Sequence, residues 1–255
     1  MRIPLPAAFL HLPIAHRALH DRAAGRPENS RAAIRAAVAA GYAIEIDLQL
    51  SADGVAMVFH DETLDRLTEA TGWVKDHSAA TLGTTRLRDA VDSIPALAEV
   101  LEIVNGAVPL LIEVKDQTLT PAGTIGPLEA ATARTLATYS GPVALMSFNP
   151  DSVAELARLC PTLPRGLTTG SYDPDEYAPI PPALCDHLRG IPDYDRTEAS
   201  FISHEAADLI RPRVAELKSQ GAAILCWTIR SAEAEAKARK IAQNITFEGY
   251  AAPFP

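Results

Sequence analysis

The chain has 255 residues, a length typical of a single eight-unit α/β barrel of about 250 residues. Hydrophobic residues make up 47% of it and charged residues 22%, which excludes an intrinsically disordered protein. The net charge of −9, with no concentrated basic run, argues against nucleic acid as a partner, whereas acidic side chains can gather around a divalent cation. We expect one domain spanning residues 1–255.

The beginning of the chain and its cysteines point to an ordinary intracellular protein. The first 15 residues contain three prolines and do not resemble a signal peptide, and no apolar run reaches membrane-spanning length. Cys160, Cys185 and Cys226 are scattered, which argues for buried thiols rather than a disulfide framework or a zinc site. We expect a cytoplasmic protein without stable membrane insertion, and the oligomeric state is left open.

Strands and helices are predicted to alternate along most of the chain. Apolar runs of strand length occupy residues 12–17, 43–50, 109–114, 143–148, 164–168, 200–203, 222–229 and 245–247. Helical patterns occupy residues 30–40, 94–104, 126–139, 150–159, 212–219 and 231–242, and Asn29 or Ser30 is expected to cap the first of these helices. Such alternation predicts parallel βαβ units, and eight strands favour a TIM-type (β/α)8 barrel over an open sheet.

Two segments interrupt this alternation. A polar stretch at about residues 61–93 follows His60 after the second strand, and a second stretch at about residues 170–197 contains five prolines. Proline removes backbone donors, so we expect no regular elements in the second stretch. Both are expected to be loops over one end of a barrel, and whether they touch substrate or only pack is left open.

Residues 43–50 alternate strictly between apolar and polar side chains. Glu45 and Asp47 share one face, and their Cα atoms should lie about 6.6 Å apart, close enough to reach one cation. In an antiparallel sheet this face could be solvent-exposed. Inside a barrel, however, two unpaired carboxylates are costly, so their burial would demand a compensating cation.

A second strand pattern, at residues 109–115, repeats the arrangement. Glu113 and Lys115 share a side, so Glu113 can supply a third oxygen ligand. Lys115 lies two residues nearer the carboxyl end of the strand, where an anionic substrate would meet the metal. The alternative is a simple ion pair between Lys115 and Glu113.

Two of the seven histidines directly follow strand-like runs, which is where the catalytic residues of barrel enzymes lie. His16 is followed by Arg17, a residue suited to binding phosphate, and His60 is followed by Asp61, a residue suited to orienting an imidazole ring. His204 also follows a short apolar run, and a structural role is the favoured interpretation for it.

The ordered set of these motifs resembles the glycerophosphodiester phosphodiesterase family across about residues 12–230. The family pattern has an opening His-Arg, a Glu-Asn-Thr-like helix start, a Glu-x-Asp strand, an Asp-Gly turn, a His-Asp pair, a Leu-x-Arg-x-Thr segment and a Glu-x-Lys strand. Its counterparts here are His16-Arg17, Pro27 to Ser30, Glu45 to Asp47, Asp53-Gly54, His60-Asp61, Leu64 to Thr68 and Glu113 to Lys115; the segments Ser147 to Asn149 and Cys226 to Thr228 are similar to later strand ends. The chain departs from the pattern at Ala18, where glycine is usual.

The resemblance implies a site and a reaction. One divalent cation, Mg²⁺ or Ca²⁺ with Mn²⁺ as a further option, is expected at three ligands, and a small glycerophosphodiester is expected to be cleaved into an alcohol and glycerol 3-phosphate. Electrostatic stabilisation and acid/base transfer by imidazole would carry the reaction. The implied residues are Glu45, Asp47 and Glu113 for the metal, His16 and His60 for acid/base catalysis, and Arg17 and Lys115 for the phosphate.

Some features of this expectation are left open. The segment at about residues 61–93 is expected to be a small insertion that caps the barrel, and Trp227 is a candidate for the substrate pocket, although aromatic residues near strand ends more often pack. One alternative is a phosphodiesterase like the phosphatidylinositol-specific phospholipases C. The other is a catalytically silent barrel that binds a phosphorylated ligand or a partner protein.

Overall fold

The computed structural model describes residues 2–115, 125–175, 177 and 180–254, which form two compact units. The N-terminal unit contains residues 14–115 and 126–143. The C-terminal unit contains residues 2–13 and the described residues from 144 to 254. Among the described residues, eight strands pair in parallel with a neighbouring strand, and one further strand pairs antiparallel. The expected alternation of parallel strands and helices is therefore confirmed.

The sheet of the N-terminal unit is centred on β2 (Ala43–Leu50), a strand whose bounds match the predicted range. It pairs in parallel with β1 (Ile14–Ala15) and β4 (Leu110–Val114), and antiparallel with β3 (Ala56–Val58). The register sets Asp47 opposite Glu113 and Ile46 opposite Ile112. Alternation then brings Glu45, Asp47 and Glu113 to the same face of the sheet.

Three helices of this unit follow the predicted pattern: α2 (Arg31–Ala40), α4 (Leu97–Val104) and α5 (Pro127–Leu136). Ser30, rather than Asn29, caps α2, because its side chain accepts a hydrogen bond from the Ala33 amide. Gly41 ends the helix with φ of 79°, a left-handed conformation that favours glycine. Ile34 is fully buried on the inner face of α2.

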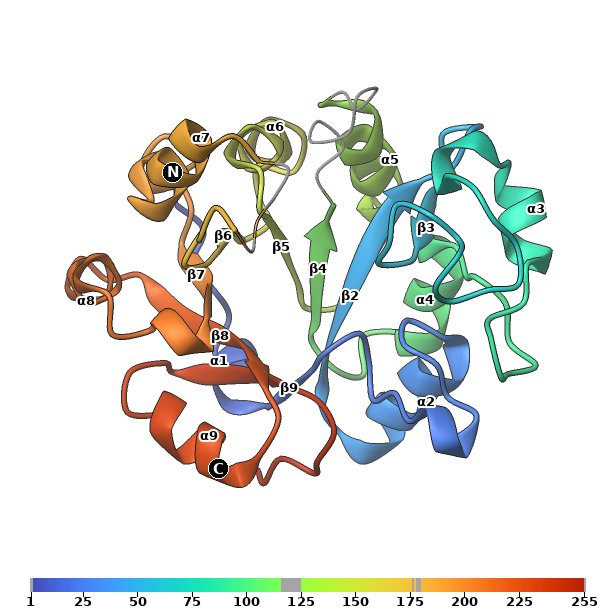
Figure 1. Ribbon diagram of the computed structural model, residues 1–255, viewed down its shortest axis with the longest axis horizontal. Coiled ribbons are helices and arrows are strands. Elements are labelled where there is room, and N and C mark those ends of the chain that lie inside the picture. Colours follow the sequence, from blue (N-terminus) through green and yellow to red (C-terminus); the bar gives the residue numbers. More distant parts are fainter. Residues whose placement is uncertain (1, 116–124, 176, 178–179, 255) are drawn as a thin grey trace. The chain divides into compact units, whose positions relative to one another are not determined.

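The insertion, residues 61–93, contains two short helices, η2 (Val74–Asp76) and α3 (Ala79–Thr84), within an otherwise irregular path. It lies beside β3 in Figure 1. A small apolar core joins it to the sheet, because Met57 of β3 and the neighbouring Phe59 pack in one cluster with buried side chains of the insertion: Leu64, Val74, Leu82 and Leu87. The insertion is therefore a packed element rather than a loose loop.

The C-terminal unit repeats strand and helix in the predicted order, and its strands β5 to β9 pair in sequence and in parallel. Its strands are β5 (Val143–Ser147), β6 (Arg165–Thr169), β7 (Phe201–Glu205), β8 (Ala223–Ile229) and β9 (Asn244–Phe247). Its helices are α1 (Ala8–His11), α6 (Pro150–Leu159), α8 (Pro212–Ser219) and α9 (Ala232–Ala238), with the short η4 (Ala206–Asp208) after β7.

The proline-rich stretch departs from the prediction, because it contains α7 (Pro182–Arg189) and η3 (Pro192–Tyr194). The expectation of no regular elements in residues 170–197 was wrong. Pro182 is the first residue of α7, where its missing N–H group would have had no partner within the helix in any case. Pro182 and Pro192 each begin a helix rather than break one.

Two expectations about the chain as a whole can be compared with the described residues. Cys160, Cys185 and Cys226 are all buried and unpaired in disulfides, as predicted. Among the helices that the structure describes, none is both long enough and apolar enough to cross a membrane.

Candidate metal and phosphate site

Three buried carboxylates converge on one face of the sheet in the N-terminal unit. Glu45 and Asp47 come from β2 and Glu113 from the neighbouring β4, and these residues are 2%, 2% and 6% exposed. Each offers an oxygen, and these oxygens all lie within 4.8 Å of one another. The pairing of Asp47 with Glu113 across the two strands produces this convergence, as the alternation of both strands predicts.

The carboxylates carry opposite electrostatic perturbations. Burial, reinforced by the charges of Asp47 and Glu113, raises the pKa of Glu45 well above its ordinary value. Burial also acts to raise the pKa of Asp47, but the nearby positive charges of His60 and Lys115 outweigh it, so that this pKa is lowered. Burial and the neighbouring carboxylates thus disfavour the charged form of Glu45, whereas the neighbouring cations favour that of Asp47.

Lys115 lies beside this cluster at the end of β4. Its Nζ is 2.7 Å from Glu113 Oε1, 3.6 Å from Asp47 Oδ1 and 3.3 Å from His60 Nε2. Burial acts to lower the pKa of Lys115, but the charges of Glu113 and Asp47 outweigh this effect and raise the pKa above its ordinary value. The ammonium therefore stays charged. The ion pair with Glu113 that was the simple alternative is present, and it occurs within the carboxylate cluster rather than instead of it.

Arg17 approaches the cluster from the turn after β1. Its backbone N–H donates to Glu45 Oε2 at 2.8 Å, and its guanidinium Nε lies 3.7 Å from Asp47 Oδ2. Arg17 and Ala18 both have left-handed backbone, with φ of 51° and 65°, and the Ala18 amide donates to the Glu45 carbonyl oxygen. Ala18 thus occupies a conformation that glycine adopts without strain, which explains why glycine suits this position.

Asn29 contacts the site, although the sequence pattern indicated it only as a possible helix cap and as part of a motif, without a role in the site. Its side-chain amide donates to Asp47 Oδ2 at 2.9 Å, and its backbone N–H donates to the Arg17 carbonyl at 2.9 Å. The side chain is buried, and the backbone is left-handed with φ of 58°. The Glu-Asn-Ser sequence before α2 was the only signal that could have identified it.

His60 lies two residues beyond β3, with its side chain 28% exposed. Its Nδ1 is 2.7 Å from Asp61 Oδ1, and its Nε2 faces Lys115 Nζ at 3.3 Å. Asp61 is therefore the partner that orients the ring, as its position in the sequence predicts. The other ring nitrogen is directed toward the edge of the carboxylate cluster.

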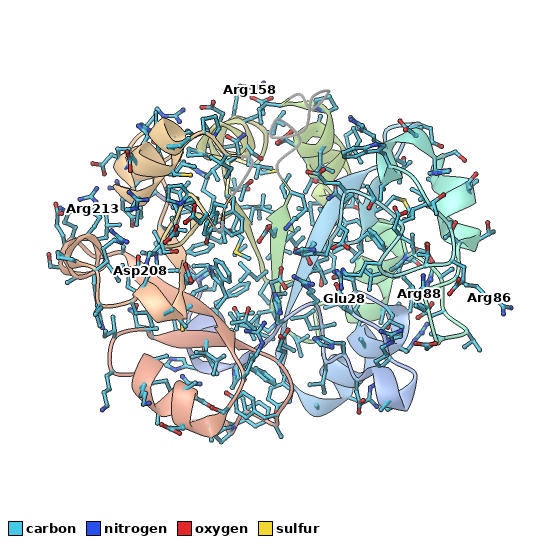
Figure 2. All side chains as sticks on the ribbon, in the orientation of Figure 1. Glu28, Arg86, Arg88, Arg158, Asp208 and Arg213 are labelled. Carbon is cyan, nitrogen blue, oxygen red and sulfur yellow. The ribbon has the colours of Figure 1, made fainter. Side chains whose placement is uncertain are left out.

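A further acid and a further arginine extend this arrangement. Arg66, in the insertion, donates to both oxygens of Asp61 and to both oxygens of Glu28, with N–O distances of 2.6 to 2.9 Å. Glu28 Oε1 also accepts from Arg17 Nη1 at 2.8 Å. Figure 2 labels Glu28, and it shows Arg86 at the outer edge of the insertion. Glu28 and Arg66 belong to motifs of the sequence, but no role was predicted for either residue.

The other two predicted site residues are His16 and Trp227. His16 immediately follows β1, whose Ala15 pairs with Ile44, so the register sets His16 level with Glu45. Trp227 belongs to β8 of the C-terminal unit, where its indole Nε1 donates to the Ser203 carbonyl at 3.0 Å and its ring packs edge-on against Phe148. These contacts give Trp227 a packing role, and its contact with a substrate stays a prediction.

Comparison with known proteins places this geometry in a family. Residues 16–245 match the model of the glycerophosphoryl diester phosphodiesterase family. The chain belongs to this family. A glycerophosphodiester phosphodiesterase of Caldanaerobacter subterraneus is 34% identical over 154 residues, which cover 55% of this chain and 60% of that protein. A putative glycerophosphodiester phosphodiesterase of Bacillus subtilis, YhdW, is 28% identical over 88% of each chain.

The solved structures of this family share the fold. A phosphodiesterase from Oleispira antarctica, solved with its product sn-glycerol-3-phosphate, aligns with a TM-score of 0.75 and 24% identity over 93% of each chain. The fold class is the TIM-type (β/α)8 barrel, as the alternating strands and helices predict. The enzyme class that the family gives is glycerophosphodiester phosphodiesterase, a phosphoric diester hydrolase.

The carboxylate cluster has the composition that a hard divalent cation requires. Glu45, Asp47 and Glu113 offer only oxygen donors, which Mg²⁺, Ca²⁺ and Mn²⁺ all prefer. All three are buried, and burial together with the neighbouring carboxylates raises the pKa of Glu45, an effect that a bound cation would oppose. The residues present therefore fit a bound metal.

Proposed function

We propose that the chain hydrolyses glycerophosphodiesters to an alcohol and glycerol 3-phosphate, using one divalent cation and histidine acid/base catalysis. The observation that carries this proposal is the buried cluster of three carboxylates beside Lys115 and His60, in a chain of this family. The product bound to the Oleispira antarctica enzyme supports glycerol 3-phosphate as the common product.

Glu45, Asp47 and Glu113 would hold the cation, which is Mg²⁺ or Ca²⁺, with Mn²⁺ as the third candidate. When bound, the cation would neutralise a non-bridging phosphate oxygen and align the nucleophile. Asn29 keeps one oxygen of Asp47 oriented through its 2.9 Å hydrogen bond, and the Arg17 amide does the same for Glu45. Such hydrogen bonds fix the direction in which a carboxylate presents its remaining lone pairs.

Arg17 and Lys115 would bind the phosphate group. Both cations lie within 4 Å of Asp47 and both are largely buried, so their charges act at short range in a medium that screens them weakly. A guanidinium and an ammonium that both lie near Asp47 can together stabilise the charge that builds up on phosphate oxygens as the bond breaks.

His16 and His60 would transfer the protons. Asp61 binds Nδ1 of His60, so Nε2 is the nitrogen of that ring that exchanges a proton with the substrate. One histidine would take a proton from the nucleophile, and the other would protonate the departing alkoxide. A substrate with a nitrophenol leaving group needs no such protonation, so the histidine whose alanine variant retains activity on that substrate is the acid.

A panel of glycerophosphodiesters tests the function directly. Release of glycerol 3-phosphate is measured with added Mg²⁺, Ca²⁺ or Mn²⁺ and with excess chelator. We expect turnover that chelation abolishes and that one of these metals restores. Turnover that persists in chelator would contradict the metal site and favour a phospholipase C-like reaction, whereas binding without turnover would favour a silent barrel. His16→Ala and His60→Ala variants that fold and keep full turnover would exclude the acid/base assignment.

The nucleophile is tested in the same assay. If a hydroxyl of the substrate's own glycerol attacks the phosphorus, a cyclic phosphate forms before the final product. If water attacks directly, no cyclic phosphate is released at any time. Phosphorus NMR of the reaction mixture separates these two routes.

A further inference from the structure

Arg66 joins the two halves of the proposed site through one guanidinium. Four of its N–H groups form hydrogen bonds, two to Asp61 and two to Glu28. An arginine binds a carboxylate most strongly in this paired geometry, because two parallel N–H···O bonds fix both distance and angle. Arg66 therefore holds both acids in fixed orientations at once.

Each of these acids contacts a residue with a proposed role in the reaction. Asp61 binds Nδ1 of His60 at 2.7 Å, and Glu28 binds Nη1 of Arg17 at 2.8 Å. The acids are 21% and 14% exposed, so their orientation is set mainly by protein groups rather than by water. The chain of contacts runs from a proton-transfer residue through Arg66 to a phosphate-binding residue.

We propose that Arg66 is a positioning residue that sets the orientation of both His60 and Arg17, through Asp61 and Glu28 respectively. This inference rests on the proposed function for the roles of those two residues. Because Arg66 belongs to the insertion, the insertion contributes to catalysis by aligning these residues and does not need to touch the substrate. Misplacement of reacting groups by about 1 Å can cost roughly 10²-fold in rate, which sets the scale of the expected effect.

A second ion pair also joins the insertion to the segment between β1 and α2, and it provides a matched control. Arg22, the first residue of the short helix η1 (Arg22–Ala24), donates through Nε to Asp89 of the insertion at 2.7 Å. Both side chains are mostly exposed, and neither has a described hydrogen bond to Asp61, Glu28, His60 or Arg17. Arg22→Gln therefore removes a link between the segments without changing the contacts of the proposed site.

The experiment compares Arg66→Gln with Arg22→Gln in the full chain. We expect Arg66→Gln to lower kcat by about 10- to 100-fold and to raise KM. Arg22→Gln should leave kcat within about threefold of wild type, because exposed ion pairs contribute little. Equal effects of the two variants on kcat and KM would overturn the inference, since a purely structural link would be lost in both.

The two branches can be separated by their kinetic parameters. Asp61→Asn should mainly lower kcat, because it loosens the proton-transfer ring, and Glu28→Gln should mainly raise KM, because it loosens the phosphate-binding arginine. Adding Arg66→Gln to the Asp61→Asn and Glu28→Gln double variant should then cost little more. If the losses multiply instead, Arg66 does not act through these acids and the inference fails.

Arg66→Lys tests whether charge alone suffices. A lysine keeps the positive charge but cannot form two paired sets of bonds at once, so we expect it to resemble Arg66→Gln. Recovery to wild-type kcat and KM would show a general charge effect and overturn the positioning role. Thermal melts accompany every variant, and Glu28→Gln opens the same contact from the other side if Arg66→Gln does not fold.

A spectroscopic readout keeps this test independent of turnover. The Cε1 proton resonance of His60, assigned by its loss in His60→Ala, reports the surroundings of the ring. We expect this resonance to move in Arg66→Gln and to stay in place in Arg22→Gln. If the wild-type chain hydrolyses no glycerophosphodiester, the proposed function fails, and this resonance still decides the positioning inference: an unmoved signal in Arg66→Gln refutes it.

Discussion

His60 and His204 show how similar partners can serve different ends in two regions of the molecule. His60 bonds Asp61, which in turn bonds Arg66. In the C-terminal unit, His204 bonds Asp208 through Nε2 at 3.2 Å, and Asp208 binds Arg211. Asp208 is labelled in Figure 2. Each ring is thus backed by an aspartate and an arginine.

The difference lies in access and in the second nitrogen of each ring. The side chain of His204 is 0% exposed, and its Nδ1 bonds the Thr169 hydroxyl at 2.8 Å, so both nitrogens are occupied by fixed partners. The side chain of His60 is 28% exposed, and its Nε2 faces Lys115. His204 is thus enclosed with both nitrogens bonded to structural partners, whereas the partly exposed ring of His60 has its second nitrogen beside a proposed phosphate-binding residue.

The largest expected effect separates the two rings by activity. His60→Ala should lower kcat by about 10²- to 10⁴-fold, because general acid/base transfer is lost. His204→Phe should keep kcat near the wild-type value when measured at a temperature where the variant is folded. A similar loss of kcat in both variants, in steady-state assays, would remove the distinction between them.

The aspartates should differ in the same direction with a smaller effect. Asp61→Asn removes the oriented acceptor at Nδ1 of His60 and should lower kcat by about 10- to 100-fold. Asp208→Asn should change thermal stability but not kcat. The comparison would fail if Asp208→Asn proved the more damaging of the two to turnover.

The stability contrast is smaller again. His204→Phe leaves the Thr169 hydroxyl and Asp208 without their ring partner, and such losses in a buried site cost about 1–3 kcal/mol. We expect the free energy of unfolding, measured by urea titration, to fall by this amount. His60→Ala should change it by less, because the ring is partly exposed. Equal stability of the two variants would argue that the His204 contacts are weak.

The smallest effect concerns pH. Burial lowers the pKa of His204 below its ordinary value of about 6.5, although Asp208 acts in the opposite direction and Arg211 adds to the lowering. As the pH falls below about 6.5, the unfolded chain takes up a proton at this position more readily than the folded chain, so the stability from the neutral ring is present above that pH and lost below it. Urea titrations at about pH 7 and pH 5.5 should show a smaller pH dependence in His204→Phe than in wild type; an unchanged dependence would contradict a depressed pKa.

The strands and the carboxylate cluster could be predicted because they depend on local alternation. The pattern from Ala43 to Leu50 determines which side chains share a face, and two such strands in parallel bring Glu45, Asp47 and Glu113 together. The position of His60 after an apolar run was informative for the same reason. The carboxylate cluster and the position of His60 can be predicted from the two-residue repeat of a strand and from the pairing of neighbouring strands.

The missed features depend on backbone turns and on contacts far apart in the sequence. Asn29 faces Asp47 because its backbone is left-handed, and the flanking residues do not predict this conformation. Arg66 and Glu28 are 38 residues apart, and they meet because the insertion packs against β3 and is tied to the segment before α2 by contacts such as Arg22 with Asp89. In the proline-rich stretch, the prolines indicated the absence of helices, whereas at a first helical position they are compatible with one.

The turn after β1 has a consequence for engineering a hardier enzyme. An alanine in the left-handed conformation costs about 1–2 kcal/mol of stability relative to glycine. Part of this difference is offset because glycine loses more conformational entropy on folding. Arg17 must keep its side chain, so the relief can come only from Ala18. Replacing Ala18 by glycine would remove one methyl group and this strain. A laboratory selection for thermostable variants would therefore be expected to find that substitution.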